Sequence, residues 1–109
     1  MKALIALILM TAVLLYVMPA MAADTNAGKD LFGKKCASCH GPDGEGKDAI
    51  AKMFKVEMKP LGSKEVQARS DADLKKVILE GSGKMKGVTG IDAKNADDIV
   101  AYLRTLAKK

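Results

Sequence analysis

The sequence Cys36-Ala37-Ser38-Cys39-His40 contains both cysteines and the single histidine of this 109-residue chain. On a helical turn, residues three apart share a face, so Cys36 and Cys39 can contact one edge of a flat ligand while His40 lies beneath its plane. A structural disulfide is a poor explanation, because the loop it would close is too small to restrict the unfolded chain much. A thioredoxin-type dithiol needs a βαβ setting, and no strand alternation precedes the motif. Structural zinc prefers four nitrogen or sulfur ligands, more than these residues supply.

The remaining explanation is covalent attachment of haem. C-x-x-C-H is the haem c attachment motif, in which each thiol adds to a vinyl group and the adjacent histidine binds the iron. We therefore expect one haem c, bound through Cys36 and Cys39, with His40 as an iron ligand. Without residues 1–22 the chain has 87 residues. A cofactor also suits a domain this short, because such a domain buries a limited hydrophobic core and often relies on a disulfide, a metal or a cofactor for stability.

A methionine thioether is the expected sixth iron ligand, because the chain has no second histidine and a thioether raises the reduction potential. The methionines outside the first 22 residues are Met53, Met58 and Met85. Met85 lies in residues 81–87, a polar glycine-rich loop where no hydrophobic stripe requires an apolar residue and where backbone can approach a flat ligand. We expect Met85 to bind iron, and Met53 and Met58 to pack against the haem ring.

The first 22 residues have the pattern of a secretory signal peptide. A positive charge at Lys2 precedes an apolar run, and a small-residue cleavage pattern ends at Ala22. We expect removal of residues 1–22, which leaves a cytochrome c domain at residues 23–109 in the periplasm, without stable membrane insertion. The alternative is an uncleaved anchor, since the apolar run nearly reaches the roughly 20 residues that span a bilayer.

The charge balance favours protein partners over nucleic acid. The formal net charge is +5, but the lysines are scattered, aromatic residues are few and no basic cluster is present. We expect redox partner proteins with acidic docking surfaces. Lys84 and Lys86 flank Met85, where positive charge can steer such a partner. The alternative is that this lysine pair only increases solubility.

Apolar residues at helical spacing predict an all-α domain, and no segment alternates for long enough to indicate a strand. The first long helix has Asp24 or Thr25 as N-cap and leads to the C-x-x-C-H motif. The second follows Ser70 and stops at Gly81, and the third follows Asn95 as N-cap. The apolar residues expected to face the core from the second and third helices are Leu74, Val77, Ile78, Ile99, Val100, Leu103 and Leu106.

These features resemble the small bacterial class I cytochromes c, of the cytochrome c-551, c-553 and c6 kind, over residues 26–107. The sequence also predicts a short helix at residues 47–55, and the resemblance implies that the three main helices and this short one are wrapped around the covalently bound haem. It also implies that Gly28 and Phe32 pack on Tyr102. Its functional implication is a one-electron carrier rather than an enzyme, and we expect a monomer.

The resemblance also assigns roles at the iron. Met85 occupies the position of the family's ligand, in a loop between the last two long helices. A proline usually follows that methionine, whereas Lys86 follows it here, so the loop is expected to be less rigid. The carbonyl of Pro60 is implied as the partner of the His40 nitrogen that does not face the iron. The sequence offers Lys55, Lys59 and Arg69 as propionate partners without choosing among them.

Two alternative functions are compatible with the same motifs. A labile Met85 would open a coordination site for gas or peroxide, although no distal histidine is available to assist peroxide chemistry. An uncleaved leader would instead suit a haem subunit tethered to a larger dehydrogenase or oxidase.

Overall fold

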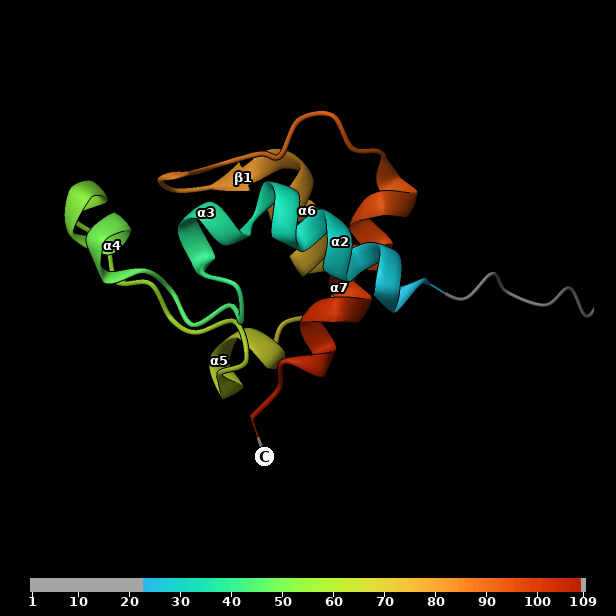
Figure 1. Cartoon of the computed structure of the whole chain (residues 1–109), viewed down its shortest axis with the longest axis horizontal. Helices are drawn as coiled ribbons and strands as arrows, with labels where there is room; N and C mark the ends of the chain where they lie inside the picture. Colours follow the sequence, from blue (N-terminus) through green and yellow to red (C-terminus); the bar gives the residue numbers. More distant parts are fainter. Residues whose placement is uncertain (1–22, 109) are drawn as a thin grey trace, which may run out of the picture.

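The computed structural model describes residues 23–108, and the expected signal peptide at residues 1–22 lies outside them. The described chain is mostly helical, with one short hairpin (Figure 1). Among these residues, no helix is long and apolar enough to cross a membrane. In chain order the elements are α2 (Thr25–Lys35), α3 (Ala37–His40), α4 (Asp48–Phe54), α5 (Lys64–Gln67), α6 (Asp71–Glu80), β1 (Gly81–Ser82), β2 (Met85–Lys86) and α7 (Ala93–Thr105).

Side-chain caps start α2 and α6 where the sequence predicts. The Asp24 carboxylate accepts the backbone N–H groups of Asn26 and Ala27, at 3.0 and 3.1 Å. The Ser70 hydroxyl accepts the N–H of Asp73 at 3.1 Å. Such caps satisfy amide groups that have no partner within the helix. Gly81 ends α6, as expected, and α4 forms within the short helix predicted at residues 47–55.

The start of α7 differs from the prediction. Asn95 was expected as N-cap, but the helix begins at Ala93 and its N-cap is Asp92. The Asp92 carboxylate accepts the N–H of Asn95 at 2.8 Å, and the Asn95 side chain accepts the N–H of Asp92 at 3.0 Å. This reciprocal capping box uses both polar residues and extends the helix by almost one turn.

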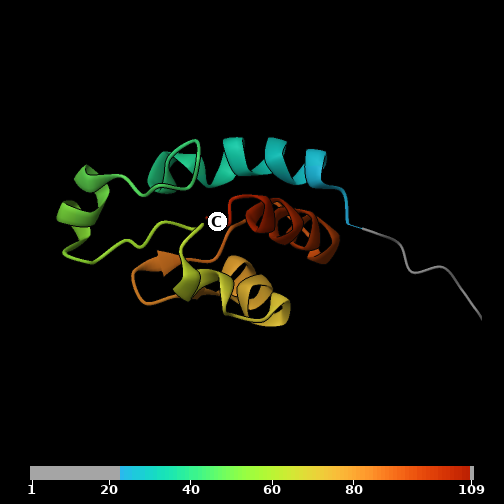
Figure 2. The same ribbon diagram turned by 90° about the horizontal axis from the view of Figure 1, so that it is seen from below.

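The core forms where α7 lies between α2 and α6 (Figure 2). The rings of Phe32 and Tyr102 have centroids 5.3 Å apart and an interplanar angle of 54°, which confirms the predicted contact between α2 and α7. Gly28 permits this crossing, because a Cβ atom there would lie only 1.9 Å from the carbonyl oxygen of Asp98. The buried core residues are Phe32, Leu74, Ile78, Ala96, Ile99, Val100, Tyr102 and Leu103.

The predicted inward faces of α6 and α7 are therefore largely confirmed. Leu74 and Ile78 are buried on α6, and Val77 is half-buried beside them. Leu106, just past the end of α7, is half-buried and packs against the core. The loop around α4 is different in character, because it projects from the body of the protein (Figures 1 and 2).

The hairpin is an addition to the expected all-α fold. Gly81 pairs with Lys86 and Ser82 pairs with Met85 in an antiparallel ladder. Gly81 has φ of 85°, and a Cβ there would lie 2.4 Å from the Met85 carbonyl oxygen, so glycine is required where α6 turns into β1. Strands of two residues are too short to leave an alternating pattern in the sequence.

Candidate haem-binding site

A cavity of about 810 Å³ lies among α3, α6, α7 and the hairpin. Its volume falls within the range of roughly 300–1,000 Å³ that is usual for small-molecule sites. It is predominantly apolar and is lined at one side by both cysteines and the histidine of the C-x-x-C-H motif. The apolar lining is Phe32, Ile50, Phe54, Val56, Met58, Leu61, Val66, Leu74, Val77, Ile78, Met85, Val88, Ile99 and Leu103.

Helix α3 places the motif at the cavity. The N–H of Cys36 donates to the carbonyl of Phe32 at 2.9 Å, so α3 continues from the end of α2. The N–H groups of Cys39 and His40 then donate to the carbonyl of Cys36, at 3.2 and 3.0 Å. This single turn brings all three side chains to the cavity wall. Because α2 packs on α7, the core fixes the position of α3.

Burial controls the protonation of these side chains. Desolvation raises the pKa of the Cys36 thiol to about 11, so the thiol is protonated at neutral pH. Reactive dithiols have lowered pKa values, and the value here argues against a redox-active dithiol. Desolvation also lowers the pKa of His40. The imidazole is therefore neutral near pH 7, in the form that binds a metal.

The hairpin brings Met85 to the same cavity. The side chain of Met85 is half-buried, whereas its neighbours Lys84 and Lys86 are exposed. The N–H of Val88 donates to the carbonyl of Ile78 at 2.8 Å, which attaches the returning strand to α6. The lining thus contains a thioether from this hairpin as well as the imidazole from α3.

The other two methionines behave differently from each other. Met58 lines the cavity and is half-buried, in agreement with its expected packing role. Met53 is 65% exposed on α4, so the prediction that it packs against the haem ring is wrong for this structure. The reason is the outward projection of α4, which directs Phe54 rather than Met53 to the cavity.

His40 Nδ1 is buried and has no hydrogen-bond partner among the described residues. The expected acceptor, the carbonyl of Pro60, instead accepts the N–H of Ser63 at 3.0 Å and closes the turn before α5. The structure therefore contains no His40–Pro60 hydrogen bond. Pro60 lies between Lys59 and Leu61, both of which line the cavity. An unpaired buried ring nitrogen is costly, and a metal-bound imidazole normally donates from its other nitrogen.

The buried carboxylate of Asp98 on α7 was not identified as an interaction site from the sequence. Asp98 is buried, accepts the N–H of Asp24 at 2.8 Å and also binds Lys94. The Lys94 side chain and the Asp24 N–H lower the pKa of Asp98, and Asp98 in turn raises the pKa of Lys94. The role of Asp98 depends on Asp24, the N-cap of α2, which lies 74 residues earlier in the chain.

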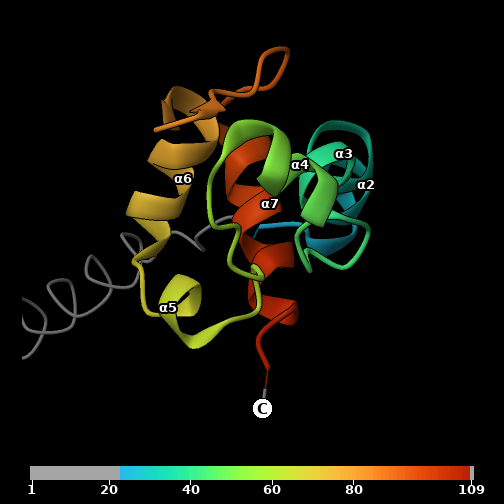
Figure 3. The ribbon, with the colours of Figure 1, turned by 90° about the vertical axis from the view of Figure 1, so that its left-hand side faces the viewer.

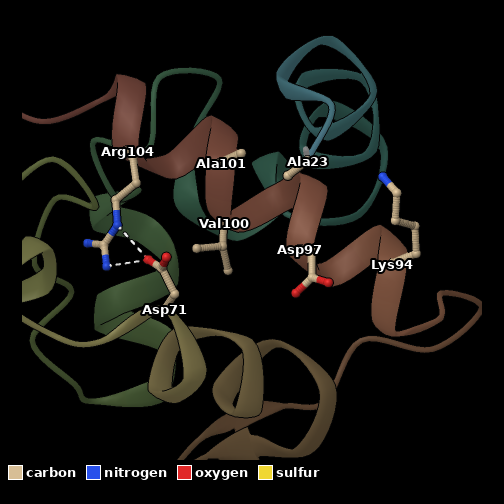
Figure 4. A pocket seen from close by; sticks show the side chains of 7 residues that line it. All are labelled: Ala23, Asp71, Lys94, Asp97, Val100, Ala101 and Arg104. Carbon is tan, nitrogen blue, oxygen red and sulfur yellow. Dashed lines mark hydrogen bonds and ion pairs between the residues drawn. The ribbon is translucent and has the colours of Figure 1, made fainter. Parts of the chain in front are cut away.

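A second cavity, of about 250 Å³, lies between Ala23 and the outer sides of α6 and α7 (Figure 4). Arg104 and Asp71 form an ion pair at one end of it, with 2.7 Å between Arg104 Nη2 and the carboxylate. Its lining has charged residues of both signs and no cysteine, histidine or methionine. Its lining therefore lacks the cysteine, histidine and methionine donors of a haem site, and among the described residues no group of three or more histidine, cysteine, aspartate or glutamate side chains could hold a metal ion.

The larger cavity fits a haem in three respects. Two free cysteines lie at its wall, a neutral imidazole and a thioether also line it, and most of the remaining lining is apolar. A porphyrin needs such a dry apolar pocket, with nitrogen and sulfur donors for iron. A small helical domain with this cavity and a C-x-x-C-H motif defines the class of c-type cytochromes.

Comparison with known proteins identifies the family. The model for "Cytochrome C oxidase, cbb3-type, subunit III" matches residues 23–103. Cytochrome c-554(547) of Halothiobacillus neapolitanus is 32% identical over 92 residues, which cover 78% of this chain and 99% of that protein. The solved structure of the KustC0563 c-type cytochrome matches with a TM-score of 0.63 and 25% identity, covering 74% of this chain and 98% of that one. The chain belongs to this cytochrome c family and is a small class I cytochrome c with covalently bound haem c.

Proposed function

We propose that this protein is a periplasmic carrier of single electrons, in which Cys36 and Cys39 hold the haem and His40 and Met85 bind its iron. The observation that supports this proposal most strongly is the shared cavity: α3 and the hairpin bring an imidazole and a thioether to the same apolar space. Haem bound in this way supplies reversible one-electron chemistry at iron. The optical spectrum of the Met85→Ala variant tests the ligand assignment.

The wall of the haem cavity suits electron transfer because core packing holds its residues rigidly. Phe32, Leu74 and Ile99 belong both to the buried core and to the cavity wall, so the packing that stabilises the fold also shapes the site. A close-packed core has few alternative arrangements, which keeps structural change on oxidation small. The apolar lining also keeps water from the iron. We propose that the main helices and α4 surround the haem. We assign no enzymatic role to the protein.

Pro60 is proposed as part of the His40 environment. A carbonyl oxygen has two lone pairs, so the Pro60 carbonyl can accept from His40 Nδ1 while it keeps its bond with the N–H of Ser63. This hydrogen bond, formed on haem binding, would satisfy the buried nitrogen. Such a bond orients the ring and increases its basicity as a ligand.

The hairpin is the proposed docking region for redox partners. Lys84 and Lys86 are exposed on either side of Met85, and Lys35 lies at the same cavity near Cys36. Positive charge near the point of electron exit raises the rate of encounter with an acidic partner, and salt weakens this effect. We propose that the monomer docks here transiently, with an acidic protein surface.

Charge reversal at Lys84 and Lys86 is expected to slow electron transfer to an acidic redox protein by about tenfold at low salt, since steering changes on-rates by roughly 10–10³-fold. The effect should shrink as salt increases. Stopped-flow measurement with the Lys84→Glu/Lys86→Glu variant checks this. The matched control is the exposed pair Lys29 and Lys34 on α2, changed in the same way. Equal rates for both variants would contradict steering by the hairpin.

Export is proposed from the leader sequence, with cleavage before Ala23. Two structural features are compatible with that position, because Asp24 caps α2 and its N–H binds Asp98. Both interactions would survive removal of residues 1–22. Intact-mass spectrometry of the periplasmic fraction is expected to show a chain that begins at Ala23 and carries one haem. A membrane-bound chain that retains the leader would favour tethering instead.

A further inference from the structure

Most charged residues of the cavity wall are basic. Five are basic and one is acidic: Lys35, Glu57, Lys59, Arg69, Lys84 and Lys86. Haem brings two propionate carboxylates into this cavity, and buried or partly buried carboxylates need positive or hydrogen-bonding partners. The position of each basic residue decides which of them can serve.

Covalent attachment fixes the direction of the propionates. The vinyl groups that react with Cys36 and Cys39 and the propionates lie on opposite sides of the porphyrin. The propionates must therefore extend away from α3. Lys35 adjoins Cys36 in sequence. The hairpin that carries Lys84 and Lys86 lies at the same end of the molecule as α3 (Figures 1 and 3), so these three lysines are not at the end away from α3.

Helix α5 does lie across the molecule from α3 (Figures 1 and 3). Two of the basic lining residues flank it, Lys59 before its start and Arg69 after its end. Glu57, the one acidic lining residue, is exposed. The side of the cavity that faces away from the cysteines is thus bordered by two cations that approach from either end of one short helix.

The backbone that carries Arg69 is firmly attached to α7. Arg104 Nη2 donates to the carbonyl of Arg69 at 2.7 Å, and Arg104 Nη1 donates to the carbonyl of Gln67 at 2.9 Å. The Gln67 side-chain amide donates to the carbonyls of Leu61 and Leu103, at 2.9 Å each. These bonds hold the segment from Leu61 to Arg69 against the same helix that forms the cavity wall. A preorganised segment binds with less loss of conformational entropy.

Each cation is paired with one carboxylate. Lys59 Nζ lies 3.2 Å from Glu65, and Arg69 Nε lies 2.5 Å from Asp73. The side chains of Lys59 and Arg69 are 47% and 43% exposed, so these ion pairs are close to solvent and contribute little on their own. Neither pair uses all of its cation's donors, because Arg69 has five N–H groups and Lys59 has three.

We propose that Arg69 and Lys59 form the binding site for the haem propionates. This inference rests on the proposed attachment through Cys36 and Cys39. The guanidinium of Arg69 donates to a carboxylate in the geometry that arginine favours, and Lys59 acts as a point charge. The ion pairs with Glu65 and Asp73 orient the Lys59 and Arg69 side chains. The two cations also tune the haem, since positive charge near the propionates disfavours the ferric state, which carries one more positive charge than the ferrous state.

The test is the reduction potential of the purified holoprotein with Arg69→Gln. The variant is expected to shift the ferric–ferrous equilibrium at least threefold towards ferric iron, which is about 28 mV at 59 mV per tenfold for one electron. Its potential should also fall more steeply with rising pH, because a propionate without its cation ionises at a higher pH. Lys59→Gln should change the potential in the same direction, and the double variant should exceed either.

Two matched variants separate this effect from others. Lys64→Gln removes the same net charge from α5, but Lys64 is exposed and outside the cavity wall, so the potential should stay close to wild type. Asp73→Asn removes the carboxylate that pairs with Arg69 but keeps the Arg69 cation. The reduction potential of this variant should therefore stay unchanged or rise. A fall in Asp73→Asn equal to that in Arg69→Gln would overturn the proposal. So would an equal fall in Lys64→Gln.

Failure of this inference is distinguishable from failure of the proposed function. If the wild-type protein shows a c-type spectrum and the iron–thioether band, but Arg69→Gln and Lys59→Gln keep its potential and pH profile, only the propionate assignment is wrong. If the wild-type protein does not contain covalently bound haem, the attachment through Cys36 and Cys39 is wrong and the propionate assignment is wrong with it.

Discussion

Replacing Met85 with alanine is expected to abolish the weak long-wavelength absorption band of a ferric iron–thioether bond and to lower the reduction potential. A thioether stabilises ferrous iron relative to ferric iron, so its loss favours the ferric state. The change should exceed tenfold in the ferric–ferrous equilibrium constant, or about 59 mV. Optical spectra and a redox titration of the purified holoprotein measure both effects.

The three methionines of the domain provide matched controls. Met58 lines the same cavity as Met85, whereas Met53 is 65% exposed on α4. Met58→Ala should keep the band, although the lost packing should reduce stability. Met53→Ala should change neither band nor stability measurably. Loss of the band in Met58→Ala with its retention in Met85→Ala would transfer the ligand role to Met58.

Absence of the band from the wild-type protein would have a different meaning. It would show that neither thioether binds ferric iron, and ligand binding at an open iron would become the leading function. This outcome is possible because Lys86, and not proline, follows Met85. A proline at that position would have limited the motion of the hairpin and kept Met85 in place. The short ladder between Ser82 and Met85 is the interaction that must hold the thioether in place.

Local signals predicted the parts of the fold that depend on neighbouring residues. Ser70 caps α6 because its hydroxyl reaches an amide three residues later, and Asp24 caps α2 in the same way. The start of α7 was misjudged because Asp92 and Asn95 are both good caps, and only the reciprocal pair of hydrogen bonds decides between them. The C-x-x-C-H motif was equally local, which is why the sequence could place one wall of the cavity.

Of the contacts between distant residues, the one between Phe32 and Tyr102 was implied by the family resemblance, but the polar contacts left no local pattern in the sequence. The attachment of α5 to α7 depends on Gln67 and Arg104, two polar residues that resemble ordinary surface positions in the sequence. The projection of α4 was also unpredictable, since its apolar residues appeared suitable for packing. The choice of Arg69 and Lys59 among many cations requires the spatial relation of α5 to α3, which periodicity does not contain.

Replacing Gly28 with alanine is expected to destabilise the protein by about 3 kcal/mol, the upper part of the usual range for overpacking a core. The new Cβ would lie 1.9 Å from the carbonyl oxygen and 2.5 Å from the carbonyl carbon of Asp98. Both are backbone atoms of α7, so no side-chain rotation can relieve the overlap. The two helices would have to separate, which would weaken the contact between Phe32 and Tyr102.

Gly33 is the matched control, because it lies on the same helix and a Cβ there meets nothing within 4 Å. Gly33→Ala should stabilise the protein by about 0.5–1 kcal/mol, the usual advantage of alanine within a helix. Denaturant unfolding of the holoproteins, followed by circular dichroism, measures both changes. If Gly28→Ala were as stable as Gly33→Ala, the close crossing of α2 and α7 would be wrong. Because Phe32 also lines the cavity, the same separation of helices should weaken the iron–thioether band in Gly28→Ala and leave it intact in Gly33→Ala.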